Sequence, residues 1–169
     1  MKIISQYFSH IFLILLLLLS TSCGFQMRGA YQLPAAMQTT YVDASGIAEG
    51  SGLSRVLIRR LKASDIKIAD SESNNIAVLT LSKEQKTKRI ISVDSRGRAR
   101  EYTLTYLISF NVNAVNEKFK IADQEIRIER DFVFDTEDVL GNSREESRLY
   151  AEMQVDVIRL IMLRLQSQG

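Results

Sequence analysis

The sequence predicts an α+β fold, a two-layer sandwich in which two helices pack on one face of a mostly antiparallel sheet. Apolar side chains recur at every second position through a central run, as in a strand with one buried face, and at helical spacing in two other segments. The elements follow in the order strand, helix, several strands and helix. With 169 residues, 46% hydrophobic and 25% charged, the chain has the size and composition of one globular domain.

The first half of the domain is expected to contain a short strand, a helix and a second short strand. Residues 39–42 are β-branched or aromatic, which favours a strand. Leu53, Leu57 and Leu61 are apolar at helical spacing, and this pattern predicts a helix that begins after a glycine-rich turn and reaches about residue 63. Residues 66–68 alternate and indicate another short strand.

The strongest pattern lies in the middle of the chain. Residues 76–93 begin as an alternating strand and continue through a charged stretch, and residues 94–97 have the polar and glycine chemistry of a tight turn. Beyond the turn, every second residue is apolar, namely Tyr102, Leu104, Tyr106, Ile108, Phe110 and Val112. After a turn at residues 116–118, alternation over residues 126–134 predicts another strand.

A second helix is predicted to close the domain. Ser143 and Glu146 match a capping box, in which a hydroxyl caps the helix and a glutamate follows three residues later. We therefore expect Gly141 and Asn142 to lie in the preceding loop. The apolar face of this helix is predicted to consist of Leu149, Met153, Val157, Leu160, Ile161 and Leu165.

The amino terminus has the parts of a secretory signal. Residues 1–22 contain Lys2, a nine-residue apolar run and a small-residue stretch before Cys23. The apolar run is shorter than the roughly 20 residues that a membrane crossing needs. A cysteine in this place is typical of a lipobox, and the alternative is an ordinary signal with an incidental cysteine. We expect residues 1–22 to be a lipoprotein signal peptide, residues 23–34 a lipidated tether and residues 35–169 one domain.

The scarcity of histidine and cysteine narrows the possible chemistry. His10 and Cys23 are the only residues of their types. Loss of the signal and acylation of Cys23 leave no imidazole and no free thiol, which excludes histidine-dependent nucleophilic sites, histidine-ligated zinc and thiol redox chemistry. We expect no metal and no cofactor besides the covalent lipid. A net charge of +2 for the whole chain also lacks the basic character of a general nucleic-acid-binding protein.

Binding or carboxylate-only catalysis remains possible after these exclusions. Asp135, Glu137 and Asp138 are the best candidates for a carboxylate hydrolase, and the alternative is a solvated loop. Arg130 occupies the apolar phase of its strand, where it requires an ion pair, a sheet edge or a ligand.

A cluster of cations surrounds the predicted turn at residues 94–97. Guanidinium groups match phosphate oxygens, so the cluster could hold an anionic group. The alternative is a solvated hairpin tip whose lysines discourage edge-to-edge strand pairing. The cluster consists of Lys83, Lys86, Lys88, Arg89, Arg96, Arg98 and Arg100.

The chain resembles the lipopolysaccharide-assembly lipoprotein family LptE. Residues 23–29, Cys-Gly-Phe-Gln-Met-Arg-Gly, are similar to the start of that family, with Met27 in place of leucine. Further similarity lies at Arg96-Gly97 with Glu101-Tyr102, in residues 130–135, and in the closing helix from Glu152-Met153 to Arg164-Leu165. The resemblance implies a two-helix, four-stranded domain without enzymatic activity.

The resemblance also implies a location and partners. It implies an outer-membrane lipoprotein, anchored through Cys23, that plugs the lumen of the β-barrel protein LptD, assists the assembly of that barrel and helps to deliver lipopolysaccharide to the outer leaflet. The alternative is a free-standing, periplasm-facing lipoprotein that binds another envelope protein or an anionic lipid. The candidates for contact with lipopolysaccharide or an acidic partner are Lys88, Arg89, Arg96, Arg98, Arg100, Arg127 and Arg130.

Overall fold

The computed structural model describes residues 31–114 and 119–168. The expected signal peptide, Cys23, most of the tether and the turn at residues 116–118 lie outside the described residues. The described elements are η2 (Ala35–Met37), β1 (Thr39–Asp43), η3 (Glu49–Ser51), α2 (Leu53–Lys62), β2 (Lys67–Ile68), β3 (Ala77–Val93), β4 (Ala99–Ala114), β5 (Phe119–Val133) and α3 (Val139–Gln166).

The α+β class is confirmed, but the expected four-stranded, mostly antiparallel sheet is wrong in detail. The sheet has five strands in the order β2-β1-β3-β4-β5 and is mixed. β1 pairs in parallel with both β2 and β3, whereas β3, β4 and β5 form an antiparallel meander. β1 and β2 are parallel because α2 carries the chain back across the sheet between them, and a helical crossover returns a strand in the same direction.

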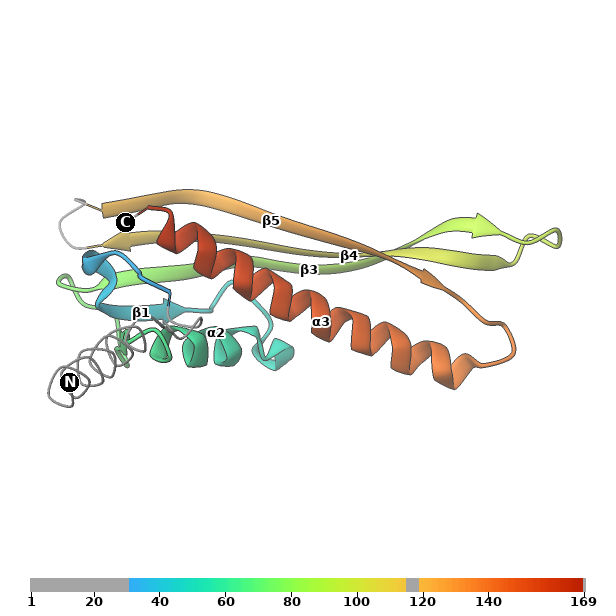
Figure 1. Cartoon of the computed structure of the whole chain (residues 1–169), viewed down its shortest axis with the longest axis horizontal. Helices are drawn as coiled ribbons and strands as arrows, with labels where there is room; N and C mark the ends of the chain where they lie inside the picture. The colour runs from blue at the N-terminus through green and yellow to red at the C-terminus, as the bar shows by residue number, and fades with distance from the viewer. Residues whose placement is uncertain (1–30, 115–118, 169) are drawn as a thin grey trace, which may run out of the picture.

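The meander is much longer than the rest of the sheet (Figure 1). β3 pairs with β4 from Val78↔Asn113 to Val93↔Ala99, while β1 covers only residues 77–80 of β3. A bulge at Ser82 interrupts the β3–β4 register, since Leu81 pairs with Phe110 and Lys83 with Ser109. The extra residue shifts the phase of side-chain alternation in the rest of β3.

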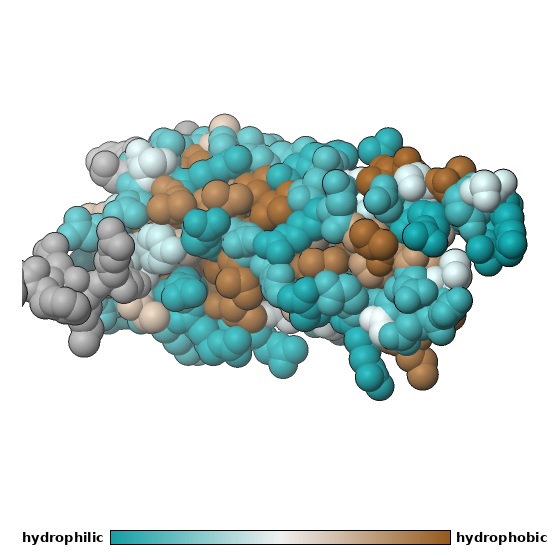
Figure 2. All heavy atoms as spheres, turned by 45° about the vertical axis from the view of Figure 1, so that its right-hand side comes forward, coloured by the Kyte–Doolittle hydropathy of each residue, from teal (hydrophilic) through white to brown (hydrophobic). Residues whose placement is uncertain are grey.

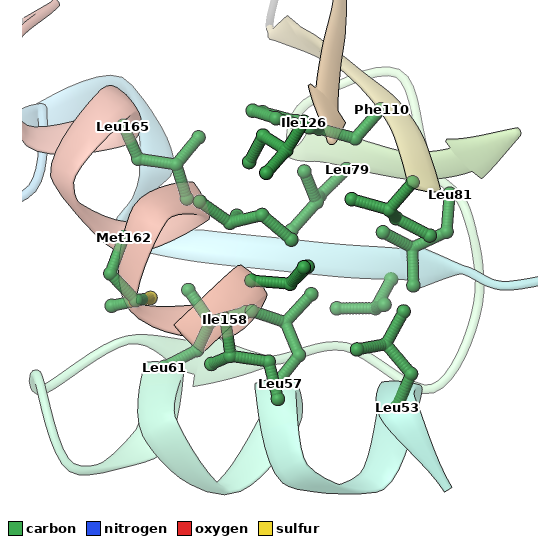
Figure 3. Packing of buried hydrophobic residues seen from close by; sticks show 14 of the residues in the cluster. Leu53, Leu57, Leu61, Leu79, Leu81, Phe110, Ile126, Ile158, Met162 and Leu165 are labelled. Atoms are coloured by element: carbon green, nitrogen blue, oxygen red, sulfur yellow. The ribbon is translucent and has the colours of Figure 1, made fainter. Parts of the chain in front are cut away.

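The core lies between one face of the sheet and the two described helices, α2 and α3. The predicted alternation in β4 is confirmed, because Leu104, Tyr106, Ile108, Phe110 and Val112 are all buried on the side that the helices cover. Both helices contribute buried side chains at helical spacing to the same layer, as Figure 3 shows for Leu53, Leu57, Leu61, Ile158, Met162 and Leu165. Burial of this one face therefore determines the two-layer architecture.

α3 begins earlier than the capping box predicted. Its N-cap is Asp138, whose side chain accepts a hydrogen bond from the Gly141 N–H at 2.8 Å. Gly141 and Asn142 are helical, and the Ser143 hydroxyl donates to the Val139 carbonyl oxygen at 3.3 Å, one turn inside the helix. Aspartate caps a helix as well as serine does, so two competing caps stood five residues apart. Although α3 has 28 residues, neither it nor any other described helix is both long and apolar enough to cross a bilayer.

Two leucines near the end of α3 test the packing argument. Leu165 is fully buried, whereas Leu163 on the same helix is 44% exposed. We expect Leu165→Ala to lower the free energy of unfolding by about 2–5 kcal/mol, because it removes core contacts and leaves a cavity. Leu163→Ala is the matched control and should cost less than about 1 kcal/mol. Urea denaturation of both variants measures the difference, and equal losses would contradict this placement of the helix.

Candidate functional site

The seven cations named as candidates for contact with lipopolysaccharide or an acidic partner lie in three places. Arg96, Arg98 and Arg100 lie at or beside the tip of the β3–β4 hairpin. Arg89 and Arg127 follow the alternation onto the sheet face away from α2 and α3, which we call the open face. Lys88 and Arg130 lie on the opposite face, which α3 covers. The cations therefore do not form one cluster.

Asp94 organises the hairpin tip. Its Oδ1 atom accepts hydrogen bonds from the Arg96 and Arg98 N–H groups at 2.8 and 2.9 Å, and Oδ2 accepts from Arg98 Nε at 2.8 Å. Gly97 has φ of 76°, in the left-handed region that suits glycine. The hydrogen bonds from Arg98 and Arg96 hold the pKa of the Asp94 carboxyl below its ordinary value.

Pairing with Asp94 separates Arg98 from its two neighbours. Arg98 is engaged in this ion pair, whereas the exposed Arg96 and Arg100 form no ion pair with any described residue. Hydrophobic side chains are exposed next to these cations, with Ile90 53%, Ile91 42% and Val93 58% accessible. Figure 2 shows hydrophobic side chains interrupting the hydrophilic surface toward the hairpin end of the molecule. The tip thus combines unpaired positive charge with exposed apolar surface.

Lys88 fills a cage formed by three aromatic rings. Its Nζ atom lies 4.2 Å from the ring centroid of Tyr102, 5.4 Å from that of Phe132 and 5.7 Å from that of Phe134. The same atom forms a salt bridge of 2.6 Å with Glu146 of α3. Lys88 therefore fastens the hairpin to the first third of α3 through cation–π and ionic contacts.

Arg130 forms the ion pairs that its position in the apolar phase required. Its Nη1 atom lies 2.8 Å from Glu152 Oε2, and its Nη2 atom lies 2.6 Å from Asp156 Oδ2. Both carboxylates belong to α3, so Arg130 joins the edge strand β5 to the helix. Arg130 and Lys88 both pair with carboxylates of α3, so neither is available to bind an external anion.

The open face is mostly polar, with Leu107 and Val133 as apolar exceptions. Thr103 donates to Asp131 at 2.8 Å, Asn111 donates to Asp123 at 2.8 Å, and Arg127 pairs with Glu129 at 2.7 Å. Hydrogen bonding by Arg127 holds the pKa of the Glu129 carboxyl below its usual range. The two described helices, α2 and α3, pack on the other face. Although Thr103, Thr105 and Leu107 are buried, most of the open face presents hydrogen-bonding groups.

The acidic residues before α3 have structural roles. Asp138 caps the helix, Asp135 Oδ1 accepts from the Glu137 N–H at 2.9 Å, and the Asp135 N–H donates to Asn142 Oδ1 at 3.0 Å. These bonds account for Asp135 and Asp138 without catalysis, and Glu137 is exposed. Across residues 31–114 and 119–168, acidic, histidine and cysteine side chains do not come together in groups of three that could hold a metal ion.

Sequence reasoning missed one buried polar pair beneath α3. The Tyr106 hydroxyl donates to Glu84 Oε1 at 2.5 Å, and Glu84 Oε2 is buried without a hydrogen-bond partner. Burial and the neighbouring Glu84 carboxyl raise the pKa of Tyr106 far above its ordinary value. The bulge at Ser82 shifts Glu84 onto the covered face, and no pattern in the sequence predicts this bulge.

Together these features define a class of protein. The fold is a small α+β domain whose distinctive chemistry lies on outer surfaces, a cationic hairpin tip and a polar open sheet face. Such surfaces suit binding to another macromolecule or to an amphiphile.

The family model described as LptE, lipopolysaccharide-assembly, matches residues 37–165, and the chain belongs to this family. The chain is 24% identical over 151 residues to an LPS-assembly lipoprotein LptE from Photorhabdus laumondii, covering 89% of this chain and 81% of the relative. It is 26% identical over 152 residues to the protein of the same name from Pectobacterium atrosepticum, covering 89% and 80%.

Solved structures agree with this assignment. The crystal structure of rare lipoprotein B from Shewanella oneidensis matches with a TM-score of 0.67 and 26% identity, over 76% of this chain and 94% of that one. The solution structure of a lipoprotein B from Nitrosomonas europaea matches with a TM-score of 0.63 and 30% identity, over 82% and 88%. The family resemblance seen in the sequence is thus confirmed.

The contacts of Lys88 should contribute measurably to the free energy of unfolding. We expect Lys88→Met, which keeps an apolar stem but removes the ammonium, to lower the free energy of unfolding by about 1–2 kcal/mol. Lys83→Met is the matched control on the same strand, because Lys83 forms no ion pair with any described residue, and it should change stability by less than about 0.5 kcal/mol. Chemical denaturation gives both values. Equal effects would contradict the fastening role of Lys88.

The stability of the hairpin turn should depend on pH through the ionisation of Asp94. Because its folded-state pKa is lowered, the ionised carboxylate stabilises the turn above the unfolded-state pKa of about 3.9. This contribution is lost as the pH falls through the folded-state pKa. We expect NMR signals of the Arg96 and Arg98 amides to shift together as Asp94 protonates below about pH 4. Asp94→Asn should abolish this titration. A titration midpoint for Asp94 at or above the ordinary aspartate pKa would contradict the prediction.

Proposed function

We propose that the chain is an outer-membrane lipoprotein, anchored through lipid on Cys23, that forms a plug complex with the β-barrel protein LptD. In this complex it assists assembly of the barrel and delivery of lipopolysaccharide to the outer leaflet. The role is one of binding, without catalysis. Family membership and the lipobox at Cys23 support the envelope assignment.

The open face supports a position inside a barrel. Large membrane barrels have polar interiors, so a protein seated in one must present hydrogen-bonding groups rather than an apolar surface. Asn111 and Arg127 present such groups on the open face, together with the carboxylates of β5. This polar face is the observation on which the plug proposal mainly rests. The described helices already cover the apolar side, so docking needs no rearrangement of the core.

The hairpin tip supports contact with lipopolysaccharide. The lipid A part of that molecule carries phosphates, and a guanidinium binds phosphate oxygens through two parallel N–H groups. Arg96 and Arg100 are exposed and form no ion pair with any described residue, so their charge is available to a ligand. Acidic loops of the barrel are an alternative partner for the same two residues.

Co-purification tests the partner. We expect the lipidated full-length protein, extracted from outer membranes in mild detergent, to be recovered in equimolar complex with a large β-barrel protein. Replacing Arg127 and Asn111 with alanine should weaken that complex, since both side chains present hydrogen-bonding groups on the open face. Recovery of the lipoprotein free of any barrel would instead support a free-standing lipoprotein that binds another envelope component.

Charge reversal at the tip tests the ligand. We expect the double variant Arg96→Glu, Arg100→Glu to bind purified lipopolysaccharide about tenfold more weakly at low salt, and the difference to shrink near 0.5 M salt. Arg55→Glu with Arg59→Glu makes the same charge change on exposed positions of α2 and serves as the control. Equal binding by both double variants would return the tip to a solvated hairpin end without a ligand.

A further inference from the structure

The outer edge of β3 beyond β1 pairs with no other described strand, although α3 approaches this segment where the Tyr150 hydroxyl donates to the Thr87 carbonyl oxygen at 2.9 Å. β1 pairs only with residues 77–80 of β3. Gly46 packs against the β3 backbone at the next two residues, Leu81 and Ser82. A Cβ on Gly46 would lie 2.6 Å from the Leu81 carbonyl oxygen and 2.7 Å from that of Ser82. From Lys83 to Ile90, β3 pairs without interruption with β4 on one side, and no other described strand pairs with its other side.

The direction of the backbone groups along this segment follows from the register. The Phe134 N–H donates to the Arg100 carbonyl oxygen, and hydrogen bonds alternate along an antiparallel pair, so even-numbered residues of β4 bond toward β5. The odd-numbered residues of β4 therefore bond toward β3, where they face Lys83, Gln85, Thr87 and Arg89. The N–H and C=O groups of the intervening residues point away from β4, namely those of Glu84, Lys86, Lys88 and Ile90.

The open segment is basic and partly apolar. Lys83 and Arg89 lie on the open face without an ion pair among the described residues, and Lys86 keeps 40% of its side chain exposed. Ile90 is 53% exposed on the helix-covered side. Pairing with a second copy of this edge would set lysine and arginine against lysine and arginine, which is unfavourable across strands. An acidic strand with interspersed apolar residues is complementary.

β5, the opposite edge, is less suited to this role. Its Arg130 points a charge into the helix-covered side, and Arg164 of α3 donates to the outer Glu125 carbonyl oxygen at 2.9 Å. Its open-face side chains are Glu125, Arg127, Glu129 and Asp131, a mixed row that is more acidic than basic. Inward charges and occupied edge carbonyls are devices that discourage strand addition.

We propose that residues 83–90 of β3 are a docking site for an extended acidic segment of another polypeptide, which adds to the sheet as a strand along the line of β1. Main-chain hydrogen bonds to Glu84, Lys86, Lys88 and Ile90 supply affinity, and Lys83 and Arg89 select acidic side chains on the open face. The eight-residue segment spans about 27 Å at about 3.4 Å per residue. The peptide test below uses neither lipopolysaccharide nor the barrel, so its failure would leave the plug proposal standing.

Defined peptides test strand addition on the full-length lipidated protein in detergent micelles. The probes are an eight-residue peptide of alternating glutamate and valine, its lysine–valine counterpart, and two glutamate–valine peptides with N-methyl groups along one or the other backbone edge. Hydrogen exchange resolved by residue is the measurement. We expect the first peptide to slow exchange of the Glu84, Lys86, Lys88 and Ile90 amides at least about tenfold.

The controls separate strand addition from simple charge attraction. Methylation of the peptide edge that faces β3 should abolish the protection, and methylation of the other edge should preserve it. Lys83→Glu with Arg89→Glu should weaken the glutamate–valine peptide about tenfold and admit the lysine–valine peptide, whereas Arg55→Glu with Arg59→Glu on α2 should change neither. Equal protection by both methylated peptides, protection of β5 amides instead, self-association through β3, or no slowing would each overturn the proposal.

Discussion

Burial of one face of β4 is the constraint on which the rest of the structure depends. Tyr106, Ile108 and Phe110 lie on the middle strand of the meander and are fully buried, which requires a covering layer on that side. α2 and α3 satisfy the requirement from opposite ends of the sequence. The opposite face is then free to be polar, and the meander is free to extend beyond the helices because β3 and β4 support each other through main-chain hydrogen bonds.

Much of this fold could be predicted because its strongest signals are local. The alternation in β4 and the leucines of α2 report directly which side is buried. The parallel pairing of β1 with β3 could not be predicted, because pairing partners depend on the path that α2 gives the chain. The start of α3 was misplaced because Asp138 and Ser143 are both good caps, and packing selects between them.

The candidate site was predicted less well, for a similar reason. The cations were recognised as residues but not as a spatial arrangement. One inserted residue at Ser82 changes the face on which Lys86 and Lys88 lie, and a bulge leaves no mark in the residue pattern. Arg130 was identified as anomalous from its phase alone, yet Glu152 and Asp156 that neutralise it lie more than twenty positions away in the sequence.

The β3–β4 hairpin is longer than the hydrocarbon core of a bilayer is thick. The chain enters the sheet through β1, beside Ala77 at the start of β3, while the tip lies at the far end of the same strand (Figure 1). The 17 residues of β3 correspond to roughly 55 Å, which exceeds the hydrocarbon thickness of a bilayer, about 30 Å. Under the proposed lipid anchor at one leaflet, this length would be enough for the hairpin to bring Arg96 to the depth of the other leaflet.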